Sequence, residues 1–154
     1  MFHCILYQPE IPPNTGNIIR LCANALIQLH LIRPLGFALD DKKMQRAGLD
    51  YHEWASVKIY DSLEVCLQDN DFNRIFACST KGRTCYAQPI YQPEDAFLFG
   101  PETRGLPLSV LQSLPMDQVI RIPMQENSRS LNLSNSVAVI LYEALRQSNF
   151  DKLS

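Results

Sequence analysis

The chain has 154 residues, of which 46% are hydrophobic and 19% charged, a composition typical of a single globular domain. Its 14 basic and 16 acidic residues give a net charge of -2, so the basic excess of a dedicated nucleic-acid binder is missing and any such site must be local. The five cysteines lack CxxC spacing, which predicts reduced thiols in a cytoplasmic protein and no metal. No apolar run reaches the roughly 20 residues of a membrane span, and we expect neither a signal peptide nor a membrane partner.

Apolar runs alternate with helical patterns along the whole chain. Six short runs, each ended by turn residues, predict buried strands at 2–7, 29–32, 57–60, 74–78, 96–99 and 119–122. The spacing of apolar residues elsewhere predicts helices over 14–28, 42–47, 62–68, 108–114 and 133–147. This alternation predicts one α/β domain over 1–154, with a mostly parallel sheet, helices on both faces, and ligands at the carboxyl ends of the strands.

The glycines and histidines exclude several common sites. The six glycines form neither GxGxxG nor a P-loop, so a standard dinucleotide or nucleoside triphosphate cradle is not expected. The three histidines are scattered without ligand spacing, so a zinc site is not expected either. The irregular segment 80–94 contains Lys81 and Arg83, with no acidic residue between Asp71 and Glu94. It is a candidate surface for phosphate groups, although a solvated loop explains it equally well.

A first polar cluster opens the helix expected over 14–28. Asn14, Asn17 and Arg20 fall on one arc of about 120° around that helix. Helix capping explains Asn14, and solvation explains Asn17. A fixed planar cation beside amides at a helix start suits an anionic oxygen, so we expect Arg20 to contact a ligand.

Two more polar clusters follow strands late in the chain. Segment 100–105 comes directly after the strand at 96–99, where a glycine allows the backbone to approach a ligand closely. A turn explains its glycines and proline but does not require Glu102 and Arg104 between them. Segment 128–136 carries six Ser or Asn side chains before an apolar helix, whereas an N-cap uses one. We interpret the surplus as ligand-binding groups rather than as a hydrophilic loop with a cap.

Together the three clusters resemble the motifs of the SPOUT-class RNA 2′-O-ribose methyltransferases. The matching residues occur in family order: Asn14 to Asn17 with Arg20, Phe99 to Glu102 with Gly105, and Ile122 to Met124 with Ser130 to Ala138. The minimal length is similar to that of the branch that methylates the wobble nucleotide, C or U, of tRNA. The resemblance implies transfer of a methyl group from S-adenosylmethionine (SAM) to a ribose 2′-hydroxyl, and a homodimer with Tyr142 in the contact. It also implies a C-terminal trefoil knot, which general fold rules disfavour and which rests on the resemblance alone.

The resemblance assigns roles to individual residues as well. The cofactor pocket would consist of Cys78, Thr80, Gly100, Pro101, Glu102, Ile122, Met124, Ser130, Leu131 and Asn132. The catalytic residues would be Arg20, Asn14, Glu102 and Asn132. Because a guanidinium is a poor base, we expect Arg20 to stabilise developing oxyanion charge, with Glu102 as an alternative base. The tRNA would contact Arg129, Arg104, Lys81 and Arg83. A second patch of Lys42, Lys43 and Arg46 has a solvated helix face as its default interpretation.

Two other classes of function stay open on the sequence. A non-catalytic RNA-binding module would keep the fold without the chemistry, although the presence of Arg20, Glu102 and Asn132 argues against it. A flavodoxin-like binder of another nucleotide would explain the alternating strands. It leaves the polar surplus of segment 128–136 unexplained.

Overall fold

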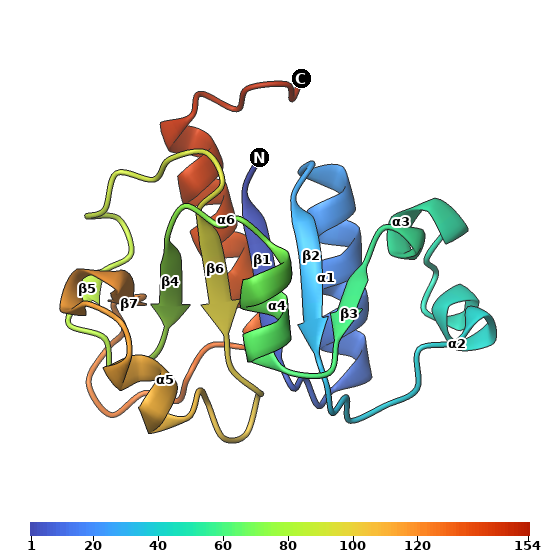
Figure 1. The fold of residues 1–154 in the computed structure, drawn as a ribbon, viewed down its shortest axis with the longest axis horizontal. Coiled ribbons are helices and arrows are strands. Elements are labelled where there is room, and N and C mark those ends of the chain that lie inside the picture. The colour runs from blue at the N-terminus through green and yellow to red at the C-terminus, as the bar shows by residue number, and fades with distance from the viewer.

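Seven strands form one sheet at the centre of the structure, a computed structural model that describes residues 1–154 except for the side chains of Asp41 and Lys43 (Figure 1). The strands are β1 (His3–Tyr7), β2 (Gln28–Ile32), β3 (Lys58–Tyr60), β4 (Ile75–Cys78), β5 (Thr84–Cys85), β6 (Ala96–Phe99) and β7 (Val119–Arg121). They lie in the order β3-β2-β1-β6-β4-β7-β5, and every neighbouring pair is parallel. Lys43 was expected to belong to a basic patch, and its side chain is outside the part of the chain that the structure describes.

The strand predictions agree closely with the sheet. All six expected strands are present, with each end within one residue of its predicted place. The two-residue β5, which pairs with β7 at the edge of the sheet, was not expected because two residues show no period. The prediction of a parallel α/β sheet is confirmed.

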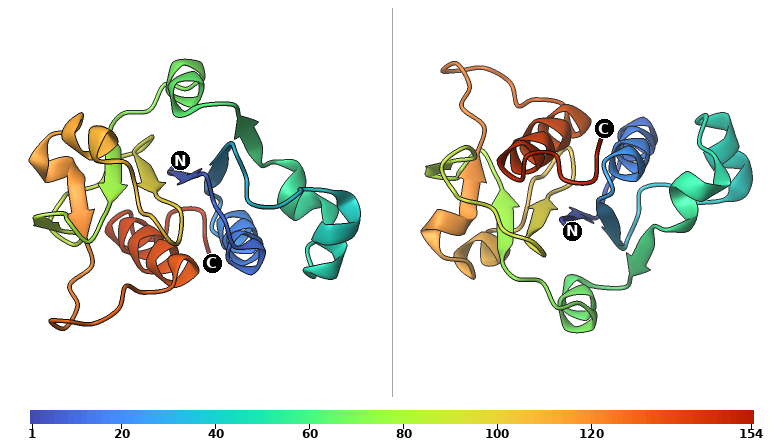
Figure 2. Two further views of the ribbon diagram at one scale, coloured as in Figure 1. Left: turned by 90° about the horizontal axis from the view of Figure 1, so that it is seen from below. Right: turned by 90° about the horizontal axis from the view of Figure 1, so that it is seen from above.

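Helices cover both faces of the sheet, as expected (Figure 2). They are α1 (Pro12–Asn24), α2 (Asp41–Arg46), α3 (Tyr51–Ala55), α4 (Leu63–Asp69), α5 (Leu108–Gln112) and α6 (Leu133–Gln147), with a 3-10 turn at Met116–Gln118. The long helices α1 and α6 lie side by side on one face, and α4 and α5 pack on the other. No described helix is long and apolar enough to cross a membrane.

Two helix predictions need correction at the start and end of α1. The helix begins at Pro12 and its N-cap is Ile11, so the interpretation of Asn14 as a helix cap is wrong. It ends at Asn24 rather than at residue 28, because Leu26 has a φ of 54° and Gln28 already belongs to β2. The apolar side chains that extended the helical pattern therefore belong to a left-handed turn and a strand.

Helix α3 was not expected from the sequence. It is only five residues long, and Asp50 and Glu53 form a capping box around its first turn. A helix this short has no independent stability, so tertiary packing must hold it. Half-buried Trp54 provides that packing against the core under α1.

Buried side chains pack around the central strands, whose carboxyl ends lie at one edge of the sheet. All four residues of β6 are buried, and the rings of Phe76, Phe97 and Phe99 are among the largest fully buried side chains. Each such side chain stabilises the fold by about 1.5–3 kcal/mol. The edge at which β1, β6, β4 and β7 end lies away from both chain termini (Figure 1). The trefoil knot stays a prediction.

Candidate functional site

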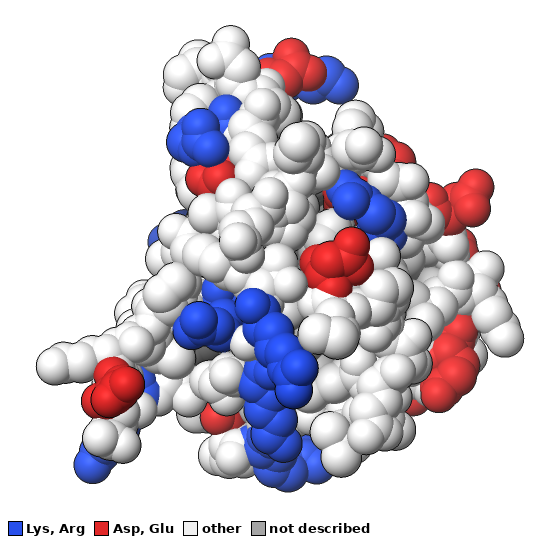
Figure 3. All heavy atoms as spheres, turned by 90° about the vertical axis from the view of Figure 1, so that its left-hand side faces the viewer, with Lys and Arg blue, Asp and Glu red and all other residues white. Residues whose placement is uncertain are grey.

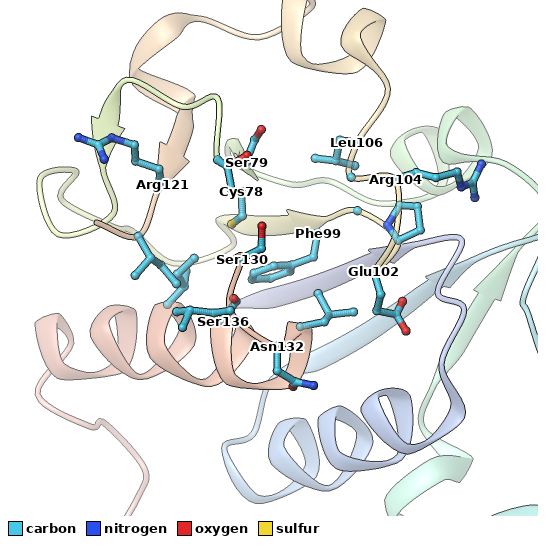
Figure 4. A pocket seen from close by; sticks show the side chains of 18 of the residues that line it. Cys78, Ser79, Phe99, Glu102, Arg104, Leu106, Arg121, Ser130, Asn132 and Ser136 are labelled. Carbon is cyan, nitrogen blue, oxygen red and sulfur yellow. The ribbon is translucent and has the colours of Figure 1, made fainter. Parts of the chain in front are cut away.

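A cavity of about 510 Å³ lies at the carboxyl ends of β4, β6 and β7 (Figure 4). Its walls are the segments that follow these strands, together with the start of α6. Its volume falls within the roughly 300–1,000 Å³ of small-molecule sites. All ten residues that the resemblance assigns to a cofactor pocket line it, namely Cys78, Thr80, Gly100, Pro101, Glu102, Ile122, Met124, Ser130, Leu131 and Asn132. The structure brings them together; SAM as their ligand stays a prediction.

A chain of hydrogen bonds joins the three polar clusters beside this cavity. Asn132 Nδ2 donates to Asn14 Oδ1 at 2.9 Å, and Asn14 Nδ2 donates to Glu102 Oε2 at 3.4 Å. The side-chain oxygen of Asn132 accepts the Ser134 N–H at 2.9 Å and so caps α6. We call this arrangement the Asn132–Asn14–Glu102 chain. It fixes segments more than 80 residues apart in one geometry.

Glu102 anchors the start of α1. Its Oε1 accepts the N–H of Glu10 at 3.0 Å, and its Oε2 accepts the N–H of Ile11 at 2.5 Å. These N–H groups lie at and before the helix N-terminus, where the helix itself provides no acceptor and a negative charge is favourable. Because both carboxylate oxygens are occupied, the geometry favours a structural role for Glu102 over the alternative role of general base.

The segment after β6 folds tightly on itself. A Cβ on Gly100 would lie 2.4 Å from the Leu106 nitrogen and 2.5 Å from the Gly105 carbonyl carbon, so only glycine fits there. Gly105 has a φ of +67°, in the left-handed region that glycine enters without strain. The close approach expected of Gly100 is therefore made to the chain's own backbone.

Arg20 lies away from the cavity of its own chain. Its Nε is 3.4 Å from Glu53 Oε1, its Nη2 donates to the Gly48 carbonyl, and its side chain is half exposed. It follows Asn14 by six helical positions, which corresponds to about 9 Å along the axis and about 120° around it. Asn14 therefore faces α6 while Arg20 faces α3. Within one chain the structure does not bring Arg20 to the other predicted site residues.

Glu10 holds segment 100–105 against the end of β1, a role that no sequence signal indicated. Its Oε1 accepts the backbone N–H of Thr103 at 2.9 Å and the Thr103 hydroxyl at 2.7 Å. These hydrogen bonds, with the charge of Arg104, hold the pKa of Glu10 below its ordinary value. Arg104 donates to Gln8 Oε1 at 3.3 Å and points away from the cavity (Figure 4). Its expected contact with tRNA therefore competes with a structural contact.

The cavity holds no reactive thiolate. Burial raises the pKa of the Cys78 thiol well above its ordinary value, so this side chain stays neutral. Among the side chains that the structure describes, no three His, Cys, Asp or Glu residues are grouped to hold a metal ion. The polar side chains of the cavity are amides and hydroxyls, together with the charged groups of Glu102, Arg104 and Arg121 at its wall.

Basic side chains gather on the edge of the sheet next to the cavity (Figure 3). Lys81 and Arg83 are exposed between β4 and β5, and Arg129 is exposed on the segment before α6. Arg121 on β7, which the sequence analysis missed, lines the cavity with its backbone end and points outward (Figure 4). None of these four cations has an ion-pair partner among the described side chains. Unpaired cations on one face suit a phosphate backbone.

The outer face of α6 exposes two apolar side chains. Tyr142 is 42% exposed and Val139 38% exposed, although the opposite face of the helix is fully buried. Exposed apolar side chains that cluster on a helix suit contact with another protein surface. Tyr142 is thus accessible, as its predicted place in a dimer contact requires.

Comparison with known proteins identifies relatives over nearly the whole chain. The tRNA (cytidine(34)-2'-O)-methyltransferase of Aeromonas hydrophila is 58% identical over 147 residues, which cover 96% of this chain and 94% of the relative. The protein of the same name from Escherichia coli K12 is 55% identical with the same coverage. A solved structure concerned with the 2-OH methylation of C/U34 on tRNA superposes with a TM-score of 0.88 at 44% identity, covering 97% of both chains. The sequence model of the SpoU rRNA Methylase family matches residues 1–142 of this chain. On this match and these identities, the chain belongs to the SpoU rRNA methylase family.

Proposed function

We propose that this protein transfers the methyl group of SAM to the ribose 2′-hydroxyl of the wobble nucleotide, C or U, in a tRNA anticodon loop. One observation carries the proposal: the hydrogen-bonded Asn132–Asn14–Glu102 chain, with one residue from each of the three motifs, lines a cavity of about 510 Å³. The relatives named for cytidine-34 methylation, alike over almost the full length, support the choice of substrate. The protein would act in the cytoplasm, where its five cysteines, all free in the structure, stay reduced.

The cavity fits SAM in its chemistry as well as its volume. Apolar side chains, among them Phe99, Ile122 and Ile140, line one part of it, and Ser130 and Asn132 add polar groups. This mixture suits a ligand that combines an aromatic base with a ribose. When bound, SAM supplies a sulfonium whose methyl group can be transferred. The chain itself contributes position, shape and exclusion of water.

Arg20 would stabilise the charge that develops on the ribose oxygen. As the oxygen–carbon bond forms and the carbon–sulfur bond breaks, the 2′-hydroxyl releases its proton to water and its oxygen passes through a partly anionic state. A fixed guanidinium lowers the energy of that state without acting as a base. The exposed Lys81, Arg83, Arg121 and Arg129 would hold tRNA phosphates near the cavity.

A homodimer would bring Arg20 to a cavity. Since Arg20 lies outside the cavity of its own chain, a second copy must supply it if it is to act on the ribose. Helices α1 and α6 lie side by side on one face, and α6 exposes Tyr142 and Val139 there. A two-fold contact through this face would place α1 of one copy near the site of the other.

Complementation between two inactive variants tests both the reaction and the shared site. Arg20→Ala lacks the guanidinium, and Asn132→Ala lacks the hydrogen bond that links Asn132 to Asn14 beside the cavity. Mixed after unfolding and refolding, they form heterodimers with one complete site. We expect methylation of tRNA from labelled SAM to recover to about a quarter of the wild-type rate, with one protected wobble ribose linkage. No recovery in the mixture would contradict the shared site, and no methylation by the wild type would contradict the function.

A further inference from the structure

The guanidinium of Arg20 is contacted on two sides, by Gly48 in the segment that connects α2 to α3 and by Glu53 of α3. Its Nε lies 3.4 Å from Glu53 Oε1, and its Nη2 donates to the carbonyl of Gly48. Its Nη1 has no hydrogen-bond partner among the atoms that the structure describes. The protein therefore contacts two of the nitrogens, Nη2 through a hydrogen bond and Nε through an ion pair, and the third is available to a ligand.

The two groups that hold Arg20 are themselves fixed. Glu53 is largely buried, with 19% of its side chain exposed, and its Oε2 accepts the Asp50 N–H at 3.1 Å in the capping box of α3. Gly48 has a φ of +76°, and its N–H donates to the Gln45 carbonyl at 3.0 Å. A side chain at Gly48 would strain this turn and shift the carbonyl that Arg20 contacts.

Stability alone gives a weak reason for this arrangement. A partly exposed ion pair contributes on the order of 0–1 kcal/mol, and the Arg20 side chain is 49% exposed. The negative charge of Glu53 also offsets part of the positive charge that Arg20 would direct at an oxyanion. What Glu53 supplies is orientation, because a planar guanidinium fixed at two nitrogens presents its remaining N–H groups in one direction.

We propose that Glu53 is a positioning residue for methyl transfer: it holds Arg20 so that the free Nη1 meets the ribose oxygen as that oxygen loses its proton. The Gly48 carbonyl holds the second nitrogen and prevents rotation of the guanidinium. This inference rests on the proposed function, since it assigns a group that acts through Arg20. Helix α3 then has a role in the reaction although it contributes nothing to the lining of the cavity.

A double-mutant cycle tests whether Glu53 acts through Arg20. The rate of tRNA methylation is measured over a range of SAM concentrations at saturating tRNA for Glu53→Ala, Arg20→Ala and the double variant. We expect Glu53→Ala to lower kcat about 10- to 100-fold and to leave the KM for SAM unchanged. In the Arg20→Ala background the same substitution should have no further effect. Losses that multiply in the double variant would overturn the proposal.

Three further variants separate positioning from folding. Asp50→Ala disturbs the same capping box without touching Arg20, so its kcat should stay close to that of the wild type. Glu53→Gln keeps an oxygen for Arg20 and should recover most of the activity. Glu53→Asp keeps the negative charge but moves the carboxylate away from Arg20 by one methylene, so its kcat should fall about tenfold. This variant replaces Glu53→Ala if the alanine variant is unstable. An equal loss of kcat in Asp50→Ala and Glu53→Ala would show a purely structural role. A wild type inactive on tRNA would instead refute the proposed function.

Discussion

His30 makes the stability of this protein sensitive to mild acid. The side chain lies in β2 with no exposed surface; its Nε2 is 3.1 Å from His3 Nδ1, and its Nδ1 is 3.1 Å from the Tyr60 hydroxyl. The ring of Phe72 packs edge-on against it. Burial, assisted by the charges of His3 and Lys58, lowers the pKa of His30 to about 3. The folded protein therefore keeps this imidazole neutral at pH 5.

The magnitude follows from proton linkage. In the unfolded chain the pKa of a histidine is about 6.5, so below that pH the unfolded state binds a proton that the folded state does not. The contribution of His30 is fully present above pH 6.5 and is lost progressively as the pH falls toward 3, by up to about 1.4 kcal/mol per pH unit. Between pH 7 and pH 5 the free energy of unfolding should fall by about 2 kcal/mol. Hydrogen bonds hold the pKa values of Glu10, Glu94 and Glu143 below their ordinary value, so the contribution of these carboxylates to stability is lost mainly below pH 5.

Urea unfolding at pH 7 and pH 5, at fixed protein concentration and ionic strength, measures the effect. We compare the wild type with His30→Gln, whose amide keeps hydrogen-bonding capacity but does not titrate. The wild type should lose about 2 kcal/mol more than the variant between the two pH values. If both lose the same free energy, His30 does not carry the acid sensitivity and the reasoning is refuted.

Three other variants test the site. Gly100→Ala should weaken SAM binding at least about tenfold by calorimetry, because its Cβ would lie 2.4 Å from the Leu106 nitrogen; an unchanged Kd would disprove the need for this close approach. Glu102→Gln leaves one of the two N–H groups at and before the N-cap of α1 without an acceptor and should lower the free energy of unfolding by about 1–3 kcal/mol, with an unchanged shape of the pH–rate profile. Loss of the acidic limb of that profile, where the rate rises as a general base is deprotonated, would instead identify Glu102 as the base. The pair Lys81→Gln and Arg83→Gln should raise the KM for tRNA and reduce the slope of log binding against log salt by about 2, with the KM for SAM unaffected as the internal control.

The fold was predictable wherever a period extends over enough residues. The buried runs of β1 and β6 and the apolar stripe of α6 repeat often enough to fix type and position. The two residues of β5 and the five of α3 are too short to show a period, and tertiary packing decides them. Leu26 was assigned to a helix because hydrophobicity does not reveal a left-handed backbone.

The site was predictable in its members but not in its geometry. The parallel sheet brings the ends of β4, β6 and β7 to one edge, so residues that follow these strands had to meet. A helical wheel grouped Asn14 with Arg20, because an arc of about 120° still looks like one face. The structure separates them, since Asn14 contacts Asn132 while Arg20 contacts Glu53. Glu10 and Glu53 went unnoticed because their partners are distant in sequence.

The Asn132–Asn14–Glu102 chain has a consequence for the order in which the protein matures. Asn14 becomes available early in synthesis, but its partner Asn132 follows 118 positions later, near the last helix. A growing polypeptide can thus form β1, α1 and β2 and still lack any affinity for a methyl donor. Binding of SAM would therefore require a chain synthesised at least through α6. Chains that end before α6 would be unable to bind SAM or transfer its methyl group.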